Sequence, residues 1–185
     1  MKLDADRVLD VVTRLLPDMG IDVLMIGGHA VNAYGVSRAT QDIDFMIAAD
    51  NVNDVRQIMH DAGFTNLAVH QTVTFFSRPG SSLRVDFLKV DRGTMDALMA
   101  NARKVNYFSG YSVWIPELKD LLAMKLFALA SVGAKREDKD FSDIVNLSME
   151  NHLDPDTDLC ELCEKFGTAE IYQRICNRIR ELRDD

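Results

Sequence analysis

The 185-residue chain is poor in the residues that mark metal-binding or disulfide-rich domains. It has only three cysteines: Cys160 and Cys163 in a CxxC spacing, and Cys176 further on. A structural zinc site needs a second such pair or histidines at ligand spacing, and neither is nearby. The spacing therefore favours small core residues on a helix over a metal or redox centre.

Long apolar stretches are also missing. No segment approaches the roughly 18 uninterrupted apolar residues needed to cross a bilayer. The first ten residues, MKLDADRVLD, are too charged for a secretory signal peptide. We therefore expect a cytoplasmic protein that makes no membrane contact and keeps its cysteines as thiols in a reducing compartment.

Positive charge is scarce, with 21 Lys and Arg against 29 Asp and Glu and a net charge of −8. Proteins that wrap nucleic acid usually carry a basic excess. Any contact with nucleic acid would need a local basic patch, for which the candidates are Arg78, Arg84, Lys89, Arg92, Arg103 and Lys104. Bound divalent cations would offset part of the negative charge.

What the chain does have is a 47% apolar composition, enough for a core, arranged in two different halves. The periodicity predicts strands and hairpins in the first half and only helices after Pro116. Irregular βα alternation with hairpins favours an α/β (α+β) mixed sheet over a doubly wound parallel one. We expect a catalytic domain at residues 1–115 and a C-terminal helical bundle at 116–185 packed on it. The expected strands are 21–26, 42–48, 72–78, 83–90, 105–108 and 111–115, and the C-terminal helices are 116–132, 139–150, 155–166 and 168–183.

Asp42 and Asp44 flank one isoleucine at the start of the apolar strand DIDFMIA. Side chains alternate across a strand, so both carboxylates share a face roughly 6 to 7 Å apart. Burying like charges that close without a partner costs several kcal/mol. A divalent cation such as Mg²⁺, which prefers carboxylate oxygens, is the compensating charge that fits best.

Two further features surround the aspartates. If the chain stays extended upstream, Arg38 and Thr40 lie on the same face, where a guanidinium suits phosphate. The pair Gly27 and Gly28 ends one strand and opens a helix. Bare amides at a helix start bind anions, and glycine lacks the Cβ that would hold a phosphate away. The group therefore indicates phosphate binding.

A third carboxylate, Asp86, alternates with Val85 and Phe87 in LRVDFLKV. An adjacent strand would bring it beside Asp42 and Asp44. Three carboxylates from two strands below a glycine turn predict a two-metal site for phosphoryl transfer.

These residues together resemble the nucleotidyltransferase fold of the DNA polymerase β superfamily. Its signature is a Gly-Gly or Gly-Ser turn, an Asp-x-Asp strand and a third Asp on a later strand, which Gly27, Gly28, Asp42, Asp44 and Asp86 match. The resemblance covers residues 20 to 90, and it extends more loosely to the helix holding Lys125 and to KREDKDFSDI with Lys139. Within the superfamily the chain looks most similar to bacterial abortive-infection or toxin nucleotidyltransferases and to small antibiotic nucleotidyltransferases.

The resemblance implies transfer of a nucleoside monophosphate from a triphosphate such as ATP to a hydroxyl, with release of pyrophosphate. It implies two Mg²⁺ ions, with Mn²⁺ as a substitute, held by the three aspartates, with Asp86 as general base or metal ligand. The nucleotide-binding candidates are Gly27, Gly28, Arg38, Thr40, Lys125 and Lys139.

The acceptor stays open at this point. We favour a toxin-like enzyme that acts on RNA, such as a tRNA end, or on protein, with an antitoxin as a further partner. The alternatives are a small-molecule, antibiotic-type enzyme and a non-catalytic module that binds a nucleotide or a partner protein. Gly28 stands where other branches often have serine, which leaves one hydroxyl fewer for phosphate. His29 can equally pack the short helix, and Lys125 can lie at the edge of an apolar stripe.

Overall fold

The computed structural model describes residues 2–132 and 137–184. The chain divides into two compact units. An α/β unit comprises Met1–Ala33 and Arg38–Glu117, and a helical unit comprises Tyr34–Ser37 and Leu118–Asp185. The division therefore falls two residues from the expected one, and a short loop after the glycine-rich helix belongs to the helical unit. The catalytic role of the first unit and the packing of the second on it stay predictions.

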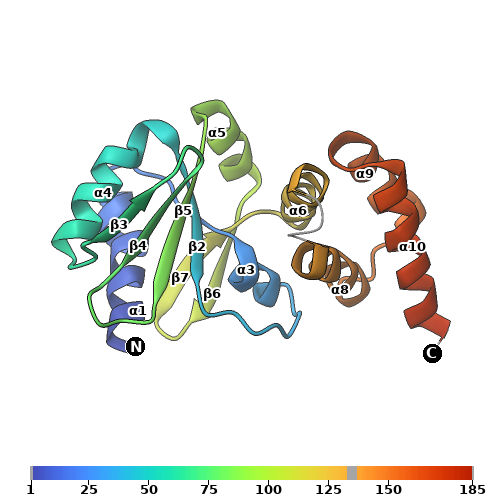
Figure 1. Cartoon of the computed structure of the whole chain (residues 1–185), viewed down its shortest axis with the longest axis horizontal. Helices are drawn as coiled ribbons and strands as arrows, with labels where there is room; N and C mark the ends of the chain where they lie inside the picture. The colour runs from blue at the N-terminus through green and yellow to red at the C-terminus, as the bar shows by residue number, and fades with distance from the viewer. Residues whose placement is uncertain (1, 133–136, 185) are drawn as a thin grey trace. The chain divides into compact units, whose positions relative to one another are not determined.

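The α/β unit is built on a five-stranded sheet in the order β1-β2-β5-β4-β3 (Figure 1). Strands β2 and β5 run parallel, and every other neighbouring pair is antiparallel. The predicted mixed sheet is thus confirmed. The strands are β1 (Leu24–Met25), β2 (Ile43–Ala48), β3 (Asn66–Val69), β4 (Val73–Ser77) and β5 (Arg84–Val90).

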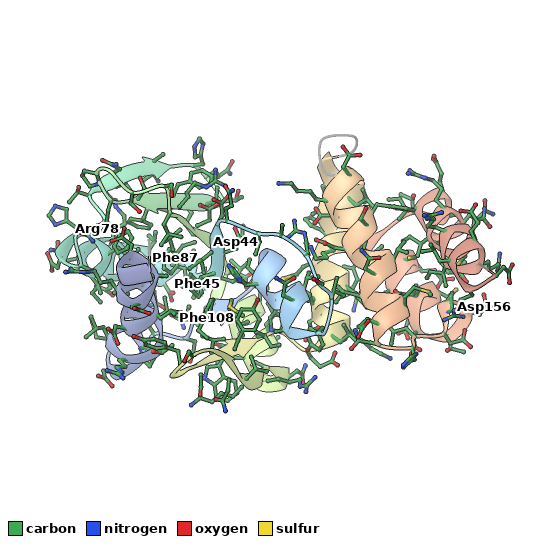
Figure 2. The ribbon with its side chains drawn as sticks, turned by 90° about the horizontal axis from the view of Figure 1, so that it is seen from below. Asp44, Phe45, Arg78, Phe87, Phe108 and Asp156 are labelled. Atoms are coloured by element: carbon green, nitrogen blue, oxygen red, sulfur yellow. The ribbon has the colours of Figure 1, made fainter. Side chains whose placement is uncertain are left out.

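Strand β2 lies inside the sheet because its apolar side chains are buried on both faces. Ile43, Phe45 and Ile47 are 3% exposed or less, and Met46 on the opposite face is equally buried. The Phe45 ring stacks on Phe87 of β5 with centroids 5.4 Å apart, and the two lie together in Figure 2. Ring pairs of this kind add about 0.5–1.5 kcal/mol beyond the area they bury. The packing therefore pins β2 against β5 in one register.

Two strands differ from the sequence prediction. Strand β3 was not predicted, because its four residues are all exposed at the sheet edge and show no apolar alternation. Only its pairing with β4 makes it a strand. Strand β1 is shorter than predicted, since only Leu24 and Met25 pair with β2.

A separate two-stranded ribbon consists of β6 (Arg103–Phe108) and β7 (Tyr111–Ile115), as predicted. The pairing shifts between Asn106 and Phe108, where β6 has an extra residue. Val113 and Ile115 are buried on one face, whereas Trp114 between them is 38% exposed. The ribbon therefore packs through one face and leaves the other open to solvent.

Helices complete the α/β unit. The first helical stretch and α4 flank the strands β3, β4 and β5 in Figure 1. The short α3 directly follows β1 and contacts β2, which places the glycine pair beside the predicted aspartates. The bounds are α1 (Lys2–Asp10), η1 (Val11–Leu15), α2 (Leu16–Asp18), α3 (Gly27–Ala33), η2 (Ala49–Asn51), α4 (Val52–Asp61) and α5 (Arg92–Asn101).

The helical unit has its own apolar core, to which the cysteines contribute. Cys163 and Cys176 are 2% and 3% exposed, and burial raises the pKa of the Cys163 thiol to about 11. Cys163 and Cys176 therefore act as small core side chains, whereas Cys160, the other member of the CxxC pair, is only partly buried. The bounds are α6 (Leu118–Val132), η3 (Glu137–Phe141), α8 (Ser142–Glu150), η4 (Pro155–Leu159), α9 (Cys160–Phe166) and α10 (Ala169–Asp184). Nowhere in residues 2–132 or 137–184 does a helix combine the length and apolar character needed to traverse a bilayer.

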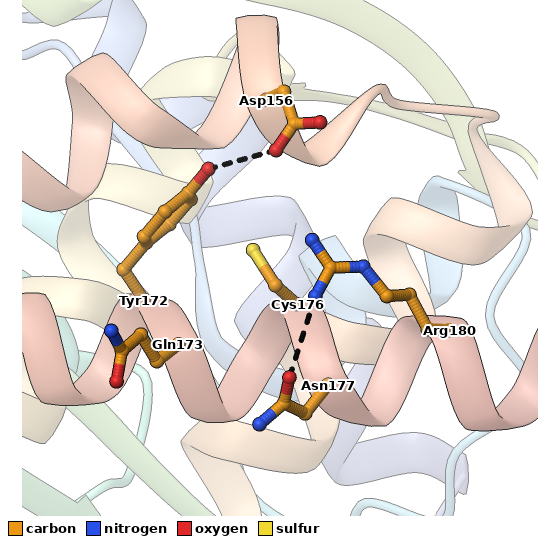
Figure 3. A pocket seen from close by; sticks show the side chains of 6 residues that line it. All are labelled: Asp156, Tyr172, Gln173, Cys176, Asn177 and Arg180. Atoms are coloured by element: carbon orange, nitrogen blue, oxygen red, sulfur yellow. Dashed lines mark hydrogen bonds between the residues drawn. The ribbon is translucent and has the colours of Figure 1, made fainter.

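A hollow of about 280 Å³ lies between η4 and α10 (Figure 3). Its polar groups bind one another: the Tyr172 hydroxyl donates to Asp156 Oδ1 at 3.1 Å, and Arg180 Nη1 donates to Asn177 Oδ1 at 3.4 Å. Because these partners satisfy each other within the helical unit, we assign the hollow no ligand.

Candidate active site

The parallel pairing of β2 and β5 brings the predicted carboxylates together. Asp44 lies directly opposite Asp86 in the register, and Asp42 stands one residue before β2 begins. Asp86 is only 7% exposed. Burial raises the pKa of Asp86 to about 6; hydrogen bonds and charge from Arg84 oppose this rise, and the nearby Asp44 and Asp42 add to it.

Arg84 supplies the positive charge that this cluster needs. Its Nε and Nη2 donate to the two carboxylate oxygens of Asp86 at 2.9 and 2.8 Å, and Nη2 lies 3.0 Å from Asp42 Oδ2. The guanidinium carbon also lies 5.0 Å from the centroid of the Phe75 ring. One arginine thus bridges two of the three carboxylates, from a position two residues before Asp86 on the same strand.

Sequence reasoning counted Arg84 as part of a basic patch on the same strand face as Asp86 and did not predict its pairing with the carboxylates. The signal for its role was the Arg-x-Asp spacing, because residues two apart on a strand share a face. A bidentate guanidinium–carboxylate pair is among the stronger side-chain interactions. Arg84 therefore offsets part of the negative charge of the three carboxylates.

The donor chemistry of this cluster fits a divalent metal. Within residues 2–132 and 137–184, no three acidic, histidine or cysteine side chains are arranged to enclose an ion. The guanidinium of Arg84 stands between Asp42 and Asp86. Carboxylate oxygens are the ligands that Mg²⁺ prefers. The cluster already binds one cationic group, the Arg84 guanidinium. The three aspartates therefore suit a divalent ion by their donor chemistry.

The glycine pair allows close approach of site side chains. Gly27 has a φ of +63°, and a Cβ there would lie 2.1 Å from Asp44 Oδ2. A Cβ on Gly28 would lie 2.0 Å from Arg38 Nη1 and 2.8 Å from Thr40 Oγ1. The prediction explained these glycines by room for phosphate. The structure shows that the space beside them is taken by Asp44, Arg38 and Thr40.

Residues 38–41 are not a strand, yet Arg38 and Thr40 still reach the site. The Asn32 amide donates to the Arg38 carbonyl at 2.9 Å, and the Arg38 amide donates to Asn32 Oδ1 at 3.1 Å. The Thr40 hydroxyl donates to the Asp42 carbonyl at 3.3 Å. Asn32, on α3, was missed by the sequence analysis and fixes the loop through main-chain contacts.

His29 packs rather than faces the carboxylates. Its Nδ1 shares a 3.3 Å hydrogen bond with the Tyr107 hydroxyl, and its ring lies 5.3 Å from that of Phe108. Burial lowers the pKa of His29, and the charge of Arg38 lowers it further. The neutral imidazole thus joins the ribbon to α3.

The two predicted lysines lie in the helical unit. Lys125 is 7% exposed, and its Nζ lies 3.1 Å from Asp140 Oδ1 and 2.6 Å from Asp143 Oδ2. Breaking such a buried pair by removing one partner typically costs about 3–5 kcal/mol. Lys125 therefore holds α6 to η3 and α8, and nucleotide binding by it stays a prediction that requires these bonds to open. Lys139 is exposed on η3, and its role is likewise untested.

Three solved structures that are similar in fold are named as nucleotidyltransferases or as nucleotidyltransferase-like. The lincomycin-bound lincosamide antibiotic adenylyltransferase LnuA is 17% identical with a TM-score of 0.56, and the match covers 80% of this chain and 96% of that one. The antibiotic-resistance enzyme ANT(2″)-Ia, in complex with adenylyl-2″-tobramycin, is 10% identical with a TM-score of 0.60, covering 96% and 98%. An antigenic nucleotidyltransferase-like protein from Paracoccidioides brasiliensis is 22% identical with a TM-score of 0.54, covering 86% and 88%.

Identities this low show a shared fold and no more. No curated protein sequence matches the chain significantly. A family model does match: residues 14–170 fit the model described as the nucleotidyl transferase AbiEii toxin of a type IV toxin–antitoxin system. The predicted resemblance is therefore confirmed. Because that match spans most of the 185 residues, the chain belongs to the AbiEii nucleotidyl transferase family and is a nucleotidyltransferase.

Proposed function

We propose that the chain is a metal-dependent enzyme that transfers a nucleoside monophosphate from a triphosphate to a hydroxyl of a macromolecule, in the manner of a toxin. Asp42, Asp44 and Asp86 are the proposed metal ligands, and Mg²⁺ is the proposed ion. The observation that carries this proposal is the register of β2 and β5, which sets Asp44 directly opposite the buried Asp86. Carboxylates gathered this closely around the buried Asp86 repel one another, which favours binding of a cation.

A divalent ion in this position would supply positive charge to the phosphates and to the attacking oxygen. The chain's own groups do the rest. Arg38 and Thr40, brought together beside Gly28, provide a guanidinium and a hydroxyl for the phosphate oxygens. The hydrogen bonds from Asn32 hold that loop before any nucleotide arrives, so little ordering is needed on binding.

The proposed reaction forms one bond and breaks one. The acceptor oxygen bonds to the α-phosphorus, and the bond from that phosphorus to the oxygen bridging to the β-phosphate breaks, so pyrophosphate leaves. The acceptor's hydroxyl proton passes to Asp86, at a carboxylate oxygen.

The experiment that tests the proposal uses each α-labelled nucleoside triphosphate with the whole protein, Mg²⁺ and a cell extract. We expect label on RNA or protein and free pyrophosphate, with loss of both in chelator. Label on a small molecule would identify an antibiotic-type enzyme instead. Nucleotide binding without pyrophosphate release, across all acceptors, would identify a non-catalytic module.

Asp44→Asn is the matched inactive variant. We expect it to abolish transfer and to leave the fold intact, because it removes a proposed metal ligand and one of several repelling charges. Asp50→Asn is its control, since Asp50 also pairs with an arginine, Arg92, but on the surface. Near-normal turnover of the Asp44 variant would contradict the assignment.

A further inference from the structure

The open face of the β6–β7 ribbon carries an aromatic ring among polar side chains. The cross-strand pairs Lys104–Trp114 and Asn106–Ser112 share this face. Lys104 Nζ lies 5.6 Å from the centroid of the Trp114 ring, and the Ser112 hydroxyl donates to Asn106 Oδ1. We call these four residues the ribbon face.

The ribbon face differs in charge from the rest of the chain. From Arg103 to Ile115 there are two basic residues and no acidic one, although acidic residues outnumber basic ones 29 to 21 overall. At the turn of the ribbon the Tyr111 hydroxyl donates to the Asp6 main-chain carbonyl at 3.4 Å, and at the other end Glu117 follows Ile115 by two residues. The basic residues, Arg103 and Lys104, lie at the end opposite the turn.

Most other residues of the predicted basic patch are bound locally. Arg78 pairs with a carboxylate of α1, Arg84 with the site aspartates, and Arg92 with Asp50. Lys89 Nζ donates to the carbonyl of His70 at 2.6 Å. Most side chains of the patch expected from the sequence therefore bind neighbouring groups of the protein. Lys104 differs, because its described contact is with an aromatic ring.

The ribbon is also fixed next to the candidate active site. On its packed side, Tyr107 hydrogen-bonds His29, which directly follows Gly28. Lys104 lies three residues from Tyr107 along β6, or about 10 Å at the rise of a strand. Lys104 and Trp114 lie on the open face of the ribbon, opposite the packed side that contacts His29.

We propose that the ribbon face binds single-stranded RNA, with one base stacked on Trp114 and one phosphate on Lys104. This assignment rests on the proposed function, of which it names the acceptor. An exposed indole offers the π-face on which an unstacked base lies, and an adjacent ammonium tracks the backbone. Lys104 lies near the outer limit of about 6 Å for a cation over a ring, so its stem can turn toward a phosphate.

Asn106 and Ser112 strengthen the choice of RNA over a protein partner. Apolar protein docking needs a continuous apolar area, and the neighbours of Trp114 on this face are a lysine, an amide and a hydroxyl. Amide and hydroxyl groups can hydrogen-bond base edges or a 2′-hydroxyl. Bases paired in a duplex keep their faces covered, so the single strand is the form this surface fits.

Trp114 is the only tryptophan in the chain, so its fluorescence reports on this face alone. The experiment titrates the whole protein, without triphosphate, with a short single-stranded RNA of mixed sequence. We expect quenching of the indole, with little quenching by the same RNA annealed to its complement. Equal quenching by the duplex, or by a polyanion without bases, would overturn the proposal.

Anisotropy of a labelled copy of the RNA extends the test to variants. Trp114→Ala should weaken binding roughly 5- to 150-fold, which corresponds to the loss of one base stack, whereas Trp114→Phe should retain most of it. Phe127→Ala, at another exposed aromatic residue, is the control. Lys104→Ala should lower the log–log salt slope by about 0.7, the share of one phosphate, and Arg178→Ala should not. Unchanged affinity in both ribbon variants would refute the assignment.

These experiments distinguish a failure of RNA binding from a failure of nucleotide transfer. RNA binding should persist in Asp44→Asn, because it needs no chemistry. If RNA quenches Trp114 but no nucleotide is ever transferred, the proposed reaction is wrong and the binding surface stands. If transfer to RNA proceeds unaffected by Trp114→Ala, or if the variant impairs transfer only to a protein acceptor, the ribbon face is not an RNA site.

Discussion

Replacing the buried Asp86 by asparagine should change how the stability of the metal-free protein depends on pH. Asparagine keeps the shape and an oxygen that accepts from Arg84, and it removes the charge. Asp86 is 7% exposed, and burial raises its pKa to about 6 from an ordinary 3.8. One pKa unit corresponds to about 1.4 kcal/mol, so ionising Asp86 costs the fold about 3 kcal/mol.

The direction follows from proton counts. Between pH 3.8 and about 6, the folded protein holds a proton on Asp86 that the unfolded chain has released. The free energy of unfolding therefore falls as pH rises through this window, and it stays lowered above pH 6. Because the asparagine variant lacks this proton, its stability relative to wild type should rise by about 3 kcal/mol across the window.

The assay is denaturant unfolding in chelator at several pH values between about 4 and 7.5, with both proteins measured side by side. Taking the difference between them cancels the other titrating groups. Asp50→Asn is the control, because this exposed carboxylate also pairs with an arginine but pays no comparable burial cost. A wild-type-minus-variant difference that stays flat from pH 4 to 7 would refute the argument that Asp86 is buried at a cost.

Three other predictions concern the same site. Divalent ions should raise the melting temperature, and triphosphate should raise it further only with metal present. A ligand at a hundredfold excess over its Kd stabilises the fold by about 2.7 kcal/mol. An equal triphosphate shift in chelator would contradict metal binding. Gly27→Ala should destabilise the fold by more than about 1–2 kcal/mol and weaken divalent binding, because the added Cβ meets Asp44. The control is Gly80→Ala, which has a similar φ of +77° and nothing within 4 Å of the added Cβ. It should show the cost of backbone strain alone. Arg84→Gln should bind Mn²⁺ roughly tenfold more tightly in a titration calorimeter, since it removes a charge-assisted competitor, whereas Arg92→Gln should not.

Much of the fold could be read from local pattern. Alternation in DIDFMIA and LRVDFLKV predicts strands that bury Phe45 and Phe87, and the turn at PGSS predicts the hairpin of β4 and β5. Strand β3 could not be predicted, because an exposed edge strand has no burial to impose alternation. It is a strand only because it forms hydrogen bonds with β4, and that pairing is set by the tertiary structure.

The site divides in the same way. The sequence by itself determined which groups are candidates for the chemistry, because Asp-x-Asp, a third aspartate on a strand and a glycine turn are local patterns with a physical reason. The tertiary structure alone decided their partners. The parallel register of β2 and β5 sets Asp44 opposite Asp86, and the pairing of Lys125 with Asp140 and Asp143 depends on helix packing. Contacts between segments distant in the chain follow from how apolar faces pack, and one-dimensional periodicity does not contain that information.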